Sequence, residues 1–213
     1  MMINDQTPTV FLVDDDPSAR RGLSRVIRIA GFNVMAFASA EDFLASPHHN
    51  GPGCIVLDVK MPGLSGLDLQ AEMTKKACAM PIIFVSGHSD VPTTAEAMKE
   101  GAVDFLTKPV DRDHLLQAIR TALDNDRAGR QAHAELEQIR TKLDKLTPRE
   151  FEVMRFVVAG LLNKQIAYKL GIAEDTVKIH RGRMMSKMDV VSVADLVRLT
   201  QKAGIEPADP DVS

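Results

Sequence analysis

Side chains that can bind a metal ion and transfer a phosphoryl group stand at the ends of apolar runs in the first half of the sequence. They are Asp14 and Asp15, Asp58, Ser86 and Lys108. A single aspartate in such a place usually serves as a turn or cap residue. Five such groups that meet at one edge of a sheet would instead form a site for a divalent metal and a phosphoryl group.

The chemistry of this set follows from its charges. Mg²⁺ takes carboxylates, phosphate oxygens and waters as ligands, so it would relieve the repulsion among the acidic residues. Asp58 is then free to attack phosphorus, as carboxylates do in aspartyl-phosphate chemistry. Lys108 would offset charge on the transferring group, and Ser86 would hydrogen-bond a phosphoryl oxygen. A helix cap needs a single acid, and the run from Asp14 to Asp16 exceeds that need.

Short apolar runs alternate with amphipathic stretches, which predicts the elements that bring these side chains together. Strands are expected at 9–13, 33–37, 55–57, 81–86 and 103–106. Helices are expected at 17–30, 65–76, 91–100 and 111–125, with a short helix after the cap residue Ser39. This order favours an α/β doubly wound, five-stranded parallel sheet, in which the carboxyl ends of the strands meet at one edge.

The composition fits a globular protein with two parts of different charge. Hydrophobic residues make up 45% of the chain and charged residues 26%. Residues 1–145 carry a net charge of −4, residues 146–205 carry +4, and residues 206–213 carry −3. Cys54 and Cys78 have neither a disulfide framework nor metal-ligand spacing. The sequence contains no signal peptide and no long apolar stretch, so we expect a cytoplasmic protein without membrane contact.

The basic part of the chain has the pattern of a small helical domain. A capping box at 147–150 opens a helix expected at 148–159. Helices at 163–170 and 174–188 are joined by a short turn that contains glycine, which predicts a helix-turn-helix. A further helix is expected at 192–203. The alternative is a pair of antiparallel helices without a role in nucleic-acid binding.

The charges of the helix at 174–188 argue against that alternative. Three apolar residues share one stripe of this helix and are expected in the core: Val177, Met184 and Met188. The segment from 176 to 187 carries four lysine or arginine residues and no acid. Glu174 and Asp175 lie in the first turn, where they complement the helix dipole. A cationic outer face on the second helix is what insertion into the major groove requires.

Residues 126–145, between the two parts, are polar and helix-forming. Apolar residues recur at every third or fourth position in and just after this segment: Ala132, Leu136, Ile139, Leu143 and Leu146. This spacing is typical of the seam of a short coiled coil. Either this helical linker touches its neighbours in the same chain, or it pairs with a second copy and carries a signal between the domains.

Residues 8–125 resemble the receiver domain of two-component response regulators. The resemblance rests on separate motifs: Asp14-Asp15, Asp58 with Met61-Pro62-Gly63, Val85-Ser86-Gly87-His88 and Lys108-Pro109. It implies that Asp58 accepts phosphate from a sensor histidine kinase. It also implies that Mg²⁺ binds a set of oxygen ligands: Asp14, Asp15, Asp58 and the backbone carbonyl of Lys60. Ser86 and Phe105 match the switch pair of the family, in which the aromatic ring moves inward when the hydroxyl engages the phosphate.

Residues 146–205 resemble the LuxR-type DNA-binding domain through Leu146-Thr-Pro-Arg-Glu150, Asn163-Lys164, Leu170-Gly171-Ile172 and Thr176-Val-Lys-Ile-His180. The whole chain is similar to the FixJ/NarL class of transcription factors. The resemblance implies a set of DNA-binding residues: Asn163, Lys164, Thr176, Lys178, Ile179, His180, Gly182 and Arg183. It also implies double-stranded promoter DNA and RNA polymerase as partners, and a homodimer that forms on phosphorylation. Residues 206–213 are expected to be a disordered tail.

Three residues depart from the LuxR-type pattern. Leu162 and Ala173 stand at helix starts where the family often has Ser or Thr, and a lost cap costs about 1 kcal/mol. Asn163 is expected to take over the first cap. Gly182 lies on the side expected to face the bases and costs about 1 kcal/mol relative to alanine. It either allows a close approach to DNA or removes a specificity contact.

These observations predict a DNA-binding transcriptional regulator that phosphorylation of Asp58 controls, and not an enzyme. Two other functions remain open. In the first, something other than phosphate controls the receiver, although the complete set of acids argues against it. In the second, the protein is an aspartyl-phosphate phosphatase or phosphotransferase that acts on small molecules. That function needs a substrate pocket, and the short loops after the strands leave little sequence to build one.

Overall fold

Two compact units make up the chain, and the boundary between them lies between Arg130 and Gln131. The structure is a computed structural model that describes residues 8–46, 52–75, 80–87 and 91–209. His88, Cys78 and residues 210–213 lie outside the described residues. Among the described helices, none combines the length and the hydropathy that a membrane span requires.

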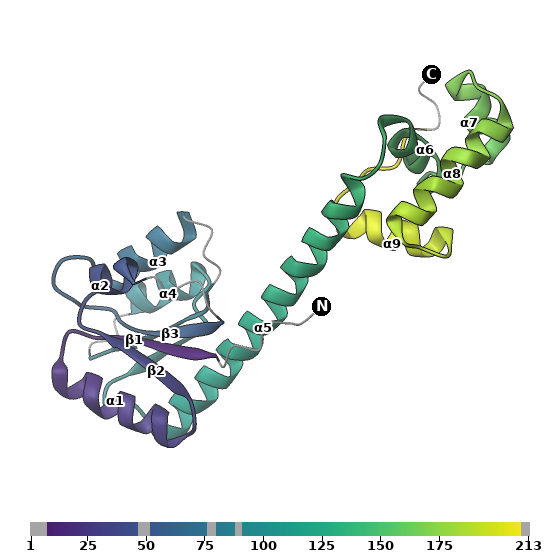
Figure 1. The fold of residues 1–213 in the computed structure, drawn as a ribbon. Helices are drawn as coiled ribbons and strands as arrows, with labels where there is room; N and C mark the ends of the chain where they lie inside the picture. The colour runs from purple at the N-terminus through teal and green to yellow at the C-terminus, as the bar shows by residue number, and fades with distance from the viewer. Residues whose placement is uncertain (1–7, 47–51, 76–79, 88–90, 210–213) are drawn as a thin grey trace. The chain divides into compact units, whose positions relative to one another are not determined.

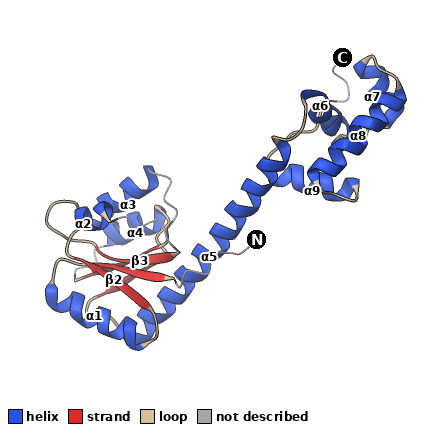
Figure 2. Cartoon of the chain, viewed as in Figure 1, coloured by secondary structure: helices blue, strands red, loops and turns tan. Residues whose placement is uncertain are grey.

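A parallel sheet forms the centre of the first unit (Figure 1, Figure 2). The described part of this unit contains five strands: β1 (Thr9–Val13), β2 (Asn33–Phe37), β3 (Gly53–Asp58), β4 (Ile82–Ser86) and β5 (Asp104–Thr107). It also contains four whole helices, α1 (Pro17–Ile29), α2 (Ala40–Ala45), α3 (Gly66–Lys75) and α4 (Val91–Lys99), and the part of α5 (Arg112–Leu143) up to Arg130. The strand order is β2-β1-β3-β4-β5. The expected doubly wound sheet is confirmed.

Helices cover both faces of this sheet (Figure 1). Successive strand residues point to opposite faces, so Val10 and Leu12 of β1 pack with α1 and α5, around Ile27. Phe11 and Val13 point the other way, into a core shared with α2, α3 and α4. The central strand β3 is buried along its whole length. Burial on both faces explains why its sequence is continuously apolar rather than alternating.

Two local caps fix where the first helices begin. The Asp16 carboxylate accepts a hydrogen bond from the Ser18 N–H at 2.7 Å and caps α1. Ser39 accepts one from the Asp42 N–H at 3.1 Å and caps α2, as expected. Asp16 alone therefore serves the helix start, which leaves Asp14 and Asp15 for another role.

Helix α5 continues past the predicted end at residue 125 and runs without a break from Arg112 to Leu143. Gly129 lies inside it. A buried carboxylate ties this part of the helix to the sheet, because Asp126 accepts a hydrogen bond from the Gly53 N–H at 3.0 Å. Arg130 pairs with the same carboxylate at 2.8 Å. Asp126 and Arg130, which lie in the predicted linker, are therefore part of the first unit.

The second unit is helical. After the end of α5, its described residues form α6 (Pro148–Val158), α7 (Asn163–Leu170), α8 (Glu174–Met188) and α9 (Val193–Lys202). The apolar sides of these helices meet in one core, which includes Val153, Met154, Ile166, Met184 and Leu196. α7 ends at Gly171, whose φ of 64° lies in the left-handed region that favours glycine. The bounds of α7 and α8 agree with the predicted helix-turn-helix.

Part of the apolar seam on α5 is used inside the second unit. Ile139 is only 3% exposed. Ion pairs flank it on both sides, from Glu135 to Lys202 of α9 at 2.6 Å and from Lys142 to Asp189 at 3.2 Å. Leu143 and Leu146 pack against the core of this unit. Most of the seam residues are therefore already in contact with their own chain, which favours the connecting-helix interpretation over a coiled coil through these positions.

The described residues of the tail contact α6. Arg155 donates hydrogen bonds to the carbonyl oxygens of Glu206, at 3.0 Å, and of Pro207, at 3.3 Å. The Ala208 N–H donates in turn to the Arg155 carbonyl at 3.1 Å. The segment that the composition predicts to be disordered therefore begins with residues that are bound to the domain.

Gly66 should be sensitive to substitution, because a Cβ atom there would lie 2.3 Å from the carbonyl oxygen of Asp58. The obstacle is backbone at the end of β3, which cannot rotate away. We expect Gly66→Ala to lower the free energy of unfolding by about 1–3 kcal/mol.

Gly22 provides the matched control, since it is an exposed residue inside α1 and a Cβ atom there meets nothing within 4 Å. Gly22→Ala should raise stability by up to about 1 kcal/mol, through helix propensity alone. Urea denaturation of both variants measures the two changes. Equal effects at the two positions would contradict the proposed role of the Asp58 contact.

Candidate functional site

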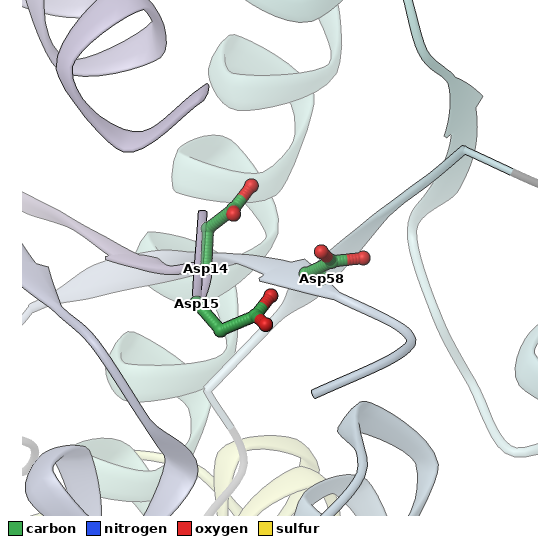
Figure 3. Close-up of side chains that lie close together, drawn as sticks. All are labelled: Asp14, Asp15 and Asp58. Atoms are coloured by element: carbon green, nitrogen blue, oxygen red, sulfur yellow. The ribbon is translucent and has the colours of Figure 1, made fainter. Parts of the chain in front are cut away.

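The predicted site residues of the first unit meet at the carboxyl edge of the sheet. Asp14 follows β1, Asp58 ends β3, Ser86 ends β4 and Lys108 follows β5. Asp14, Asp15 and Asp58 form an acid cluster in which one oxygen atom of each lies within 4.8 Å of the others (Figure 3). Asp14 and Asp58 are buried and Asp15 is exposed, so the cluster opens to solvent on one side.

Lys108 bridges the two buried acids. Its Nζ donates to Asp14 Oδ2 and to Asp58 Oδ2, at 2.9 Å in each case. Its backbone N–H donates to the Ser86 carbonyl at 2.8 Å, which holds the start of the β5–α5 loop next to β4. Burial opposes the charge on Lys108, but the hydrogen bonds to Asp14 and Asp58 outweigh it and raise the pKa of the ammonium group. Lys108 is therefore positively charged throughout the neutral range.

The surroundings of Asp14 disfavour the ionised form of its carboxyl group. Burial raises the pKa of its carboxyl above the usual value, and the nearby Asp58 adds to that rise. The hydrogen bond from Lys108 and the one from the Asp16 N–H, at 2.9 Å, oppose it without cancelling it. A carboxylate in this situation gains from any added positive charge.

Arg20 of α1 contributes to the site, a role that was not predicted from the sequence. Its Nη1 donates to the carbonyl oxygens of Asp14, at 2.5 Å, and of Asp15, at 3.2 Å. The guanidinium thus fixes the backbone that carries two members of the acid cluster. The available signal was a cation one helical turn beyond a run of acids, a pattern that is also common without any such contact.

Ser86 and Phe105 lie on the same side of the sheet. Ser86 pairs in register with Thr107, and Phe84 pairs with Phe105. Because residues two apart on a strand share a face, the Ser86 hydroxyl and the Phe105 ring both point toward α3 and α4. Ser86 is buried, whereas Phe105 is half-buried, with its ring centroid 6.2 Å from that of Phe84.

Lys60, whose backbone carbonyl is a predicted metal ligand, lies next to the acid cluster. Its backbone N–H lies 3.4 Å from Asp58 Oδ1.

The candidate nucleic-acid face of the second unit lies on α7 and α8. The expected core stripe of α8 is buried, since Val177, Met184 and Met188 are each 0% exposed. Five residues of the predicted set are exposed: Lys164, Lys178, Ile179, Gly182 and Arg183. The other three are half-buried: Asn163, Thr176 and His180. Within the described residues, His180 Nδ1 is the buried side-chain nitrogen that has no hydrogen-bond partner.

The expected cap by Asn163 is wrong. Asn163 is the first residue of α7, and its Oδ1 accepts a hydrogen bond from Arg181 of α8 at 2.9 Å. The Leu162 N–H is satisfied instead by Gln165 Oε1 at 2.8 Å. Ala173, before α8, makes no side-chain cap, in agreement with the sequence. Asn163 therefore holds the two helices of the helix-turn-helix together.

Glu150 also has a second partner that the sequence did not reveal. It completes the predicted capping box with Thr147, whose N–H donates to Glu150 Oε2 at 2.9 Å. The same oxygen accepts a hydrogen bond from Lys187 of α8 at 2.6 Å, and Glu150 is only 2% exposed. The start of α6 thus fixes the far end of α8.

Two protein-family sequence models match the chain. The family described as response regulator receiver domain matches residues 10–120. The family described as bacterial regulatory proteins, luxR family, matches residues 144–200. The first match contains the acid cluster and Lys108, and the second contains α6, α7, α8 and most of α9.

Several proteins are similar along nearly the whole chain. Nodulation protein W of Bradyrhizobium diazoefficiens is 47% identical over 92% of this chain and 86% of its own. The transcriptional regulatory protein FixJ of Rhizobium meliloti is 39% identical over 94% of this chain and 98% of its own.

Solved structures are similar as well. That of the response regulator StyR is 46% identical and superposes with a TM-score of 0.84, over 92% of this chain and 100% of its own. Full-length FixJ from B. japonicum is 38% identical with a TM-score of 0.57, over 93% of this chain and 98% of its own.

The acid cluster should limit stability when no divalent metal is added. Because Asp14 is buried beside Asp58 and its pKa is raised, its ionised form destabilises the fold above that pKa. We expect Asp14→Asn to raise the free energy of unfolding at pH 7 by about 1 kcal/mol. Added Mg²⁺ should stabilise the wild type and not this variant.

Asp16→Asn is the matched control, since it removes the same charge from the exposed helix cap, where asparagine caps equally well. Its stability and its response to Mg²⁺ should equal those of the wild type. Thermal melts with and without Mg²⁺ measure both properties. An Asp14→Asn variant that melts below the wild type in the absence of metal would contradict this account of the cluster.

Glu150 should support the second unit in a pH-dependent way. Its hydrogen bonds with Lys187 and Thr147 lower the pKa of its carboxyl below the ordinary 4.5. Because the folded pKa is depressed, the stabilisation is complete above about pH 4.5 and is lost as the pH falls through the folded pKa. Glu150→Gln should cost about 2 kcal/mol at pH 7 and flatten this acid dependence.

Glu152→Gln is the comparison for Glu150, because it removes an exposed pair with Arg149 on the same helix. That change should cost less than about 0.5 kcal/mol. Calorimetry of the unfolding transition of the second unit, at pH values from 3 to 7, separates the two variants. A flat pH profile for the wild type would rule out the buried Glu150–Lys187 contact as the source.

Proposed function

The chain belongs to the response regulators that join a receiver domain to a LuxR-family DNA-binding domain, and on this premise we propose that phosphorylation of Asp58 controls its binding to promoter DNA. It is thus a DNA-binding transcriptional regulator of a two-component system. The members of this family are signalling and DNA-binding proteins rather than enzymes, so the small-molecule phosphatase alternative is set aside.

One observation supports the assignment of Asp58 more than any other. Lys108 Nζ lies 2.9 Å from both Asp14 and Asp58, and the oxygens of the acid cluster lie within 4.8 Å of one another. The donors are oxygen atoms only, which is the ligand type that Mg²⁺ prefers. Asp58 is the member that ends the central strand; its Oδ2 accepts a hydrogen bond from Lys108, and its Oδ1 lies 3.4 Å from the backbone N–H of Lys60. It is the carboxylate best placed to meet a phosphoryl donor.

The transfer itself needs little from the protein beyond position and charge. An oxygen of the Asp58 carboxylate attacks the phosphorus of a phosphohistidine on a sensor histidine kinase and forms the O–P bond. The P–N bond breaks, its electron pair stays on the histidine nitrogen, and that nitrogen takes up a proton from water. Bound through Asp14, Asp15, Asp58 and the backbone carbonyl of Lys60, Mg²⁺ would offset the negative charge gathered there. Lys108 turns from Asp58 to an oxygen of the new phosphoryl group and keeps its pair with Asp14.

Ser86 and Phe105 carry the change outward. Ser86 stands at the end of β4, beside Asp58, and its hydroxyl donates to the phosphoryl group once this group is in place. The movement leaves room on the face where the half-buried Phe105 ring lies, and the ring moves inward. The surface formed by α4, β5 and α5 changes shape as a result, and the phosphorylated receiver forms a homodimer.

The homodimer presents two copies of α8 to double-stranded promoter DNA, on half-sites about one helical turn apart. The DNA contacts come from Asn163, Lys164, Thr176, Lys178, Ile179, His180, Gly182 and Arg183. Bound in this way, the protein acts on transcription through RNA polymerase. Because its target is chromosomal DNA, its place of action is the cytoplasm.

The proposal is tested by gel-shift binding to a candidate promoter, with and without a small phosphodonor and Mg²⁺, for the wild type and Asp58→Ala. We expect the phosphodonor to tighten binding by the wild type about tenfold, which is the scale of typical allosteric coupling. Asp58→Ala should bind at the basal level in all conditions. Electrophoresis that retards phosphorylated protein should show a shifted band for the wild type only.

Asp16→Asn serves as a control, because it removes a neighbouring charge outside the cluster, keeps the helix cap and should keep the response. If Asp58→Ala responds to the phosphodonor like the wild type, Asp58 is not the control point. If both proteins bind equally well in every condition, the receiver is governed by something other than phosphate.

A further inference from the structure

Asp175, in the first turn of α8, forms an ion pair with Lys178. The distance from Asp175 Oδ1 to Lys178 Nζ is 3.0 Å, whereas Glu174 Oε1 lies 3.8 Å away. The Asp175 side chain is 88% exposed, so this carboxylate and its partner both reach into solvent. The sequence suggests only that Asp175 complements the helix dipole, a role that Glu174 fills equally well.

The position of Asp175 on the helix is central to the candidate DNA face. At 100° per residue, Asp175 lies within about 20° of Gly182, two turns further on, and nearly opposite the buried Val177. Lys178 and Ile179 lie on either side of that line. A Cβ atom at Gly182 would meet nothing within 4 Å, so the surface beside Asp175 is open. If this side of α8 enters a major groove, the carboxylate lies close to the centre line of the inserted face, in the first turn of the helix.

The paired groups match the pattern of one base pair. In the major groove, guanine offers two acceptors, O6 and N7, and its cytosine partner offers the N4 amino donor beside them. A lysine ammonium donates to the guanine acceptors, and an aspartate carboxylate accepts from the cytosine amino group. Asp175 and Lys178 present an acceptor and a donor about one hydrogen-bond length apart, already oriented by their own ion pair.

We propose that Asp175 is a specificity-determining residue that, together with Lys178, contacts one G·C base pair in each half-site. This inference rests on the proposed DNA-binding function and adds a base preference to it. The carboxylate also repels phosphates, so it weakens binding to all sequences while strengthening discrimination among them. A lysine alone on this face would attract duplexes of any sequence through their phosphates.

The test uses the full-length wild type, the single variants Asp175→Asn, Glu174→Gln and Lys178→Met, and the double variant that combines Asp175→Asn with Lys178→Met. Each protein is incubated with Mg²⁺ and a small phosphodonor and then with a library of randomised DNA duplexes. Asp175→Asn and Glu174→Gln remove the same charge from the same helical turn, but only Asp175 is within hydrogen-bond distance of Lys178. Sequencing of the bound duplexes gives the base preference at each position. A fluorescent duplex of random sequence measures non-specific affinity in parallel.

We expect the wild-type motif to contain a cytosine in each half-site whose preference falls about tenfold in Asp175→Asn. Glu174→Gln should keep the wild-type motif. Both variants should bind the random duplex more tightly, because both lose one repulsive charge. Lys178→Met should lose the guanine preference at the same base pair, and Asp175→Asn should add little to that loss.

Two results would overturn the inference. In the first, Asp175→Asn keeps the wild-type motif; in the second, it changes the motif only as Glu174→Gln does, so that charge alone acts. A wild type that enriches no sequence over the starting library would overturn the proposed DNA-binding function, and this inference with it. Failure of this inference and failure of the DNA-binding function are distinguishable, because only failure of the DNA-binding function removes enrichment from the wild type.

Discussion

The repulsion among three carboxylates at one edge of the sheet is the constraint on which the first unit depends. Asp14 and Asp58 are both buried, and Lys108 is the cation that holds them together at 2.9 Å each. The fold therefore holds these carboxylates close together despite their electrostatic repulsion. Strand pairing and the hydrogen bonds from Arg20 fix the backbone that carries them. A site held in this way gains from an added cation, because further positive charge offsets the repulsion that Lys108 balances only in part.

The second unit fixes α8 by two polar contacts, one at the middle of the helix and one near its carboxyl end. Asn163 of α7 accepts from Arg181, and Glu150 of α6 accepts from Lys187. These contacts take two of the basic residues of α8 out of the set that is free to meet DNA. The cations left exposed, Lys178 and Arg183, are those on the outer side. The basic residues of this helix thus serve two purposes. Those on its inner side hold the domain together, and those on its outer side are available to contact DNA.

Strands and helices were predictable from sequence to within a few residues, because hydrophobic period, caps and glycine stops act locally. The candidate site was predictable too, since parallel strands bring their carboxyl ends together whatever the loops contain. Contacts between polar residues far apart in sequence were not. Asn163 has the right type for a cap, and only the position of Arg181 shows that it serves another purpose. The continuation of α5 through Gly129 was missed for a related reason, because the buried Asp126 contact outweighs a weak local propensity.

Asp126 also bears on how the receiver can be separated from the rest of the chain. The family match to the receiver ends at residue 120, six residues before this side chain. A fragment cut at that boundary would keep every strand and the whole acid cluster, yet leave the Gly53 N–H, at the start of the central strand, without its acceptor. The receiver as a folding unit is therefore longer than the receiver as a region of shared sequence. A receiver transferred to another protein would need the part of α5 that carries the Asp126 carboxylate.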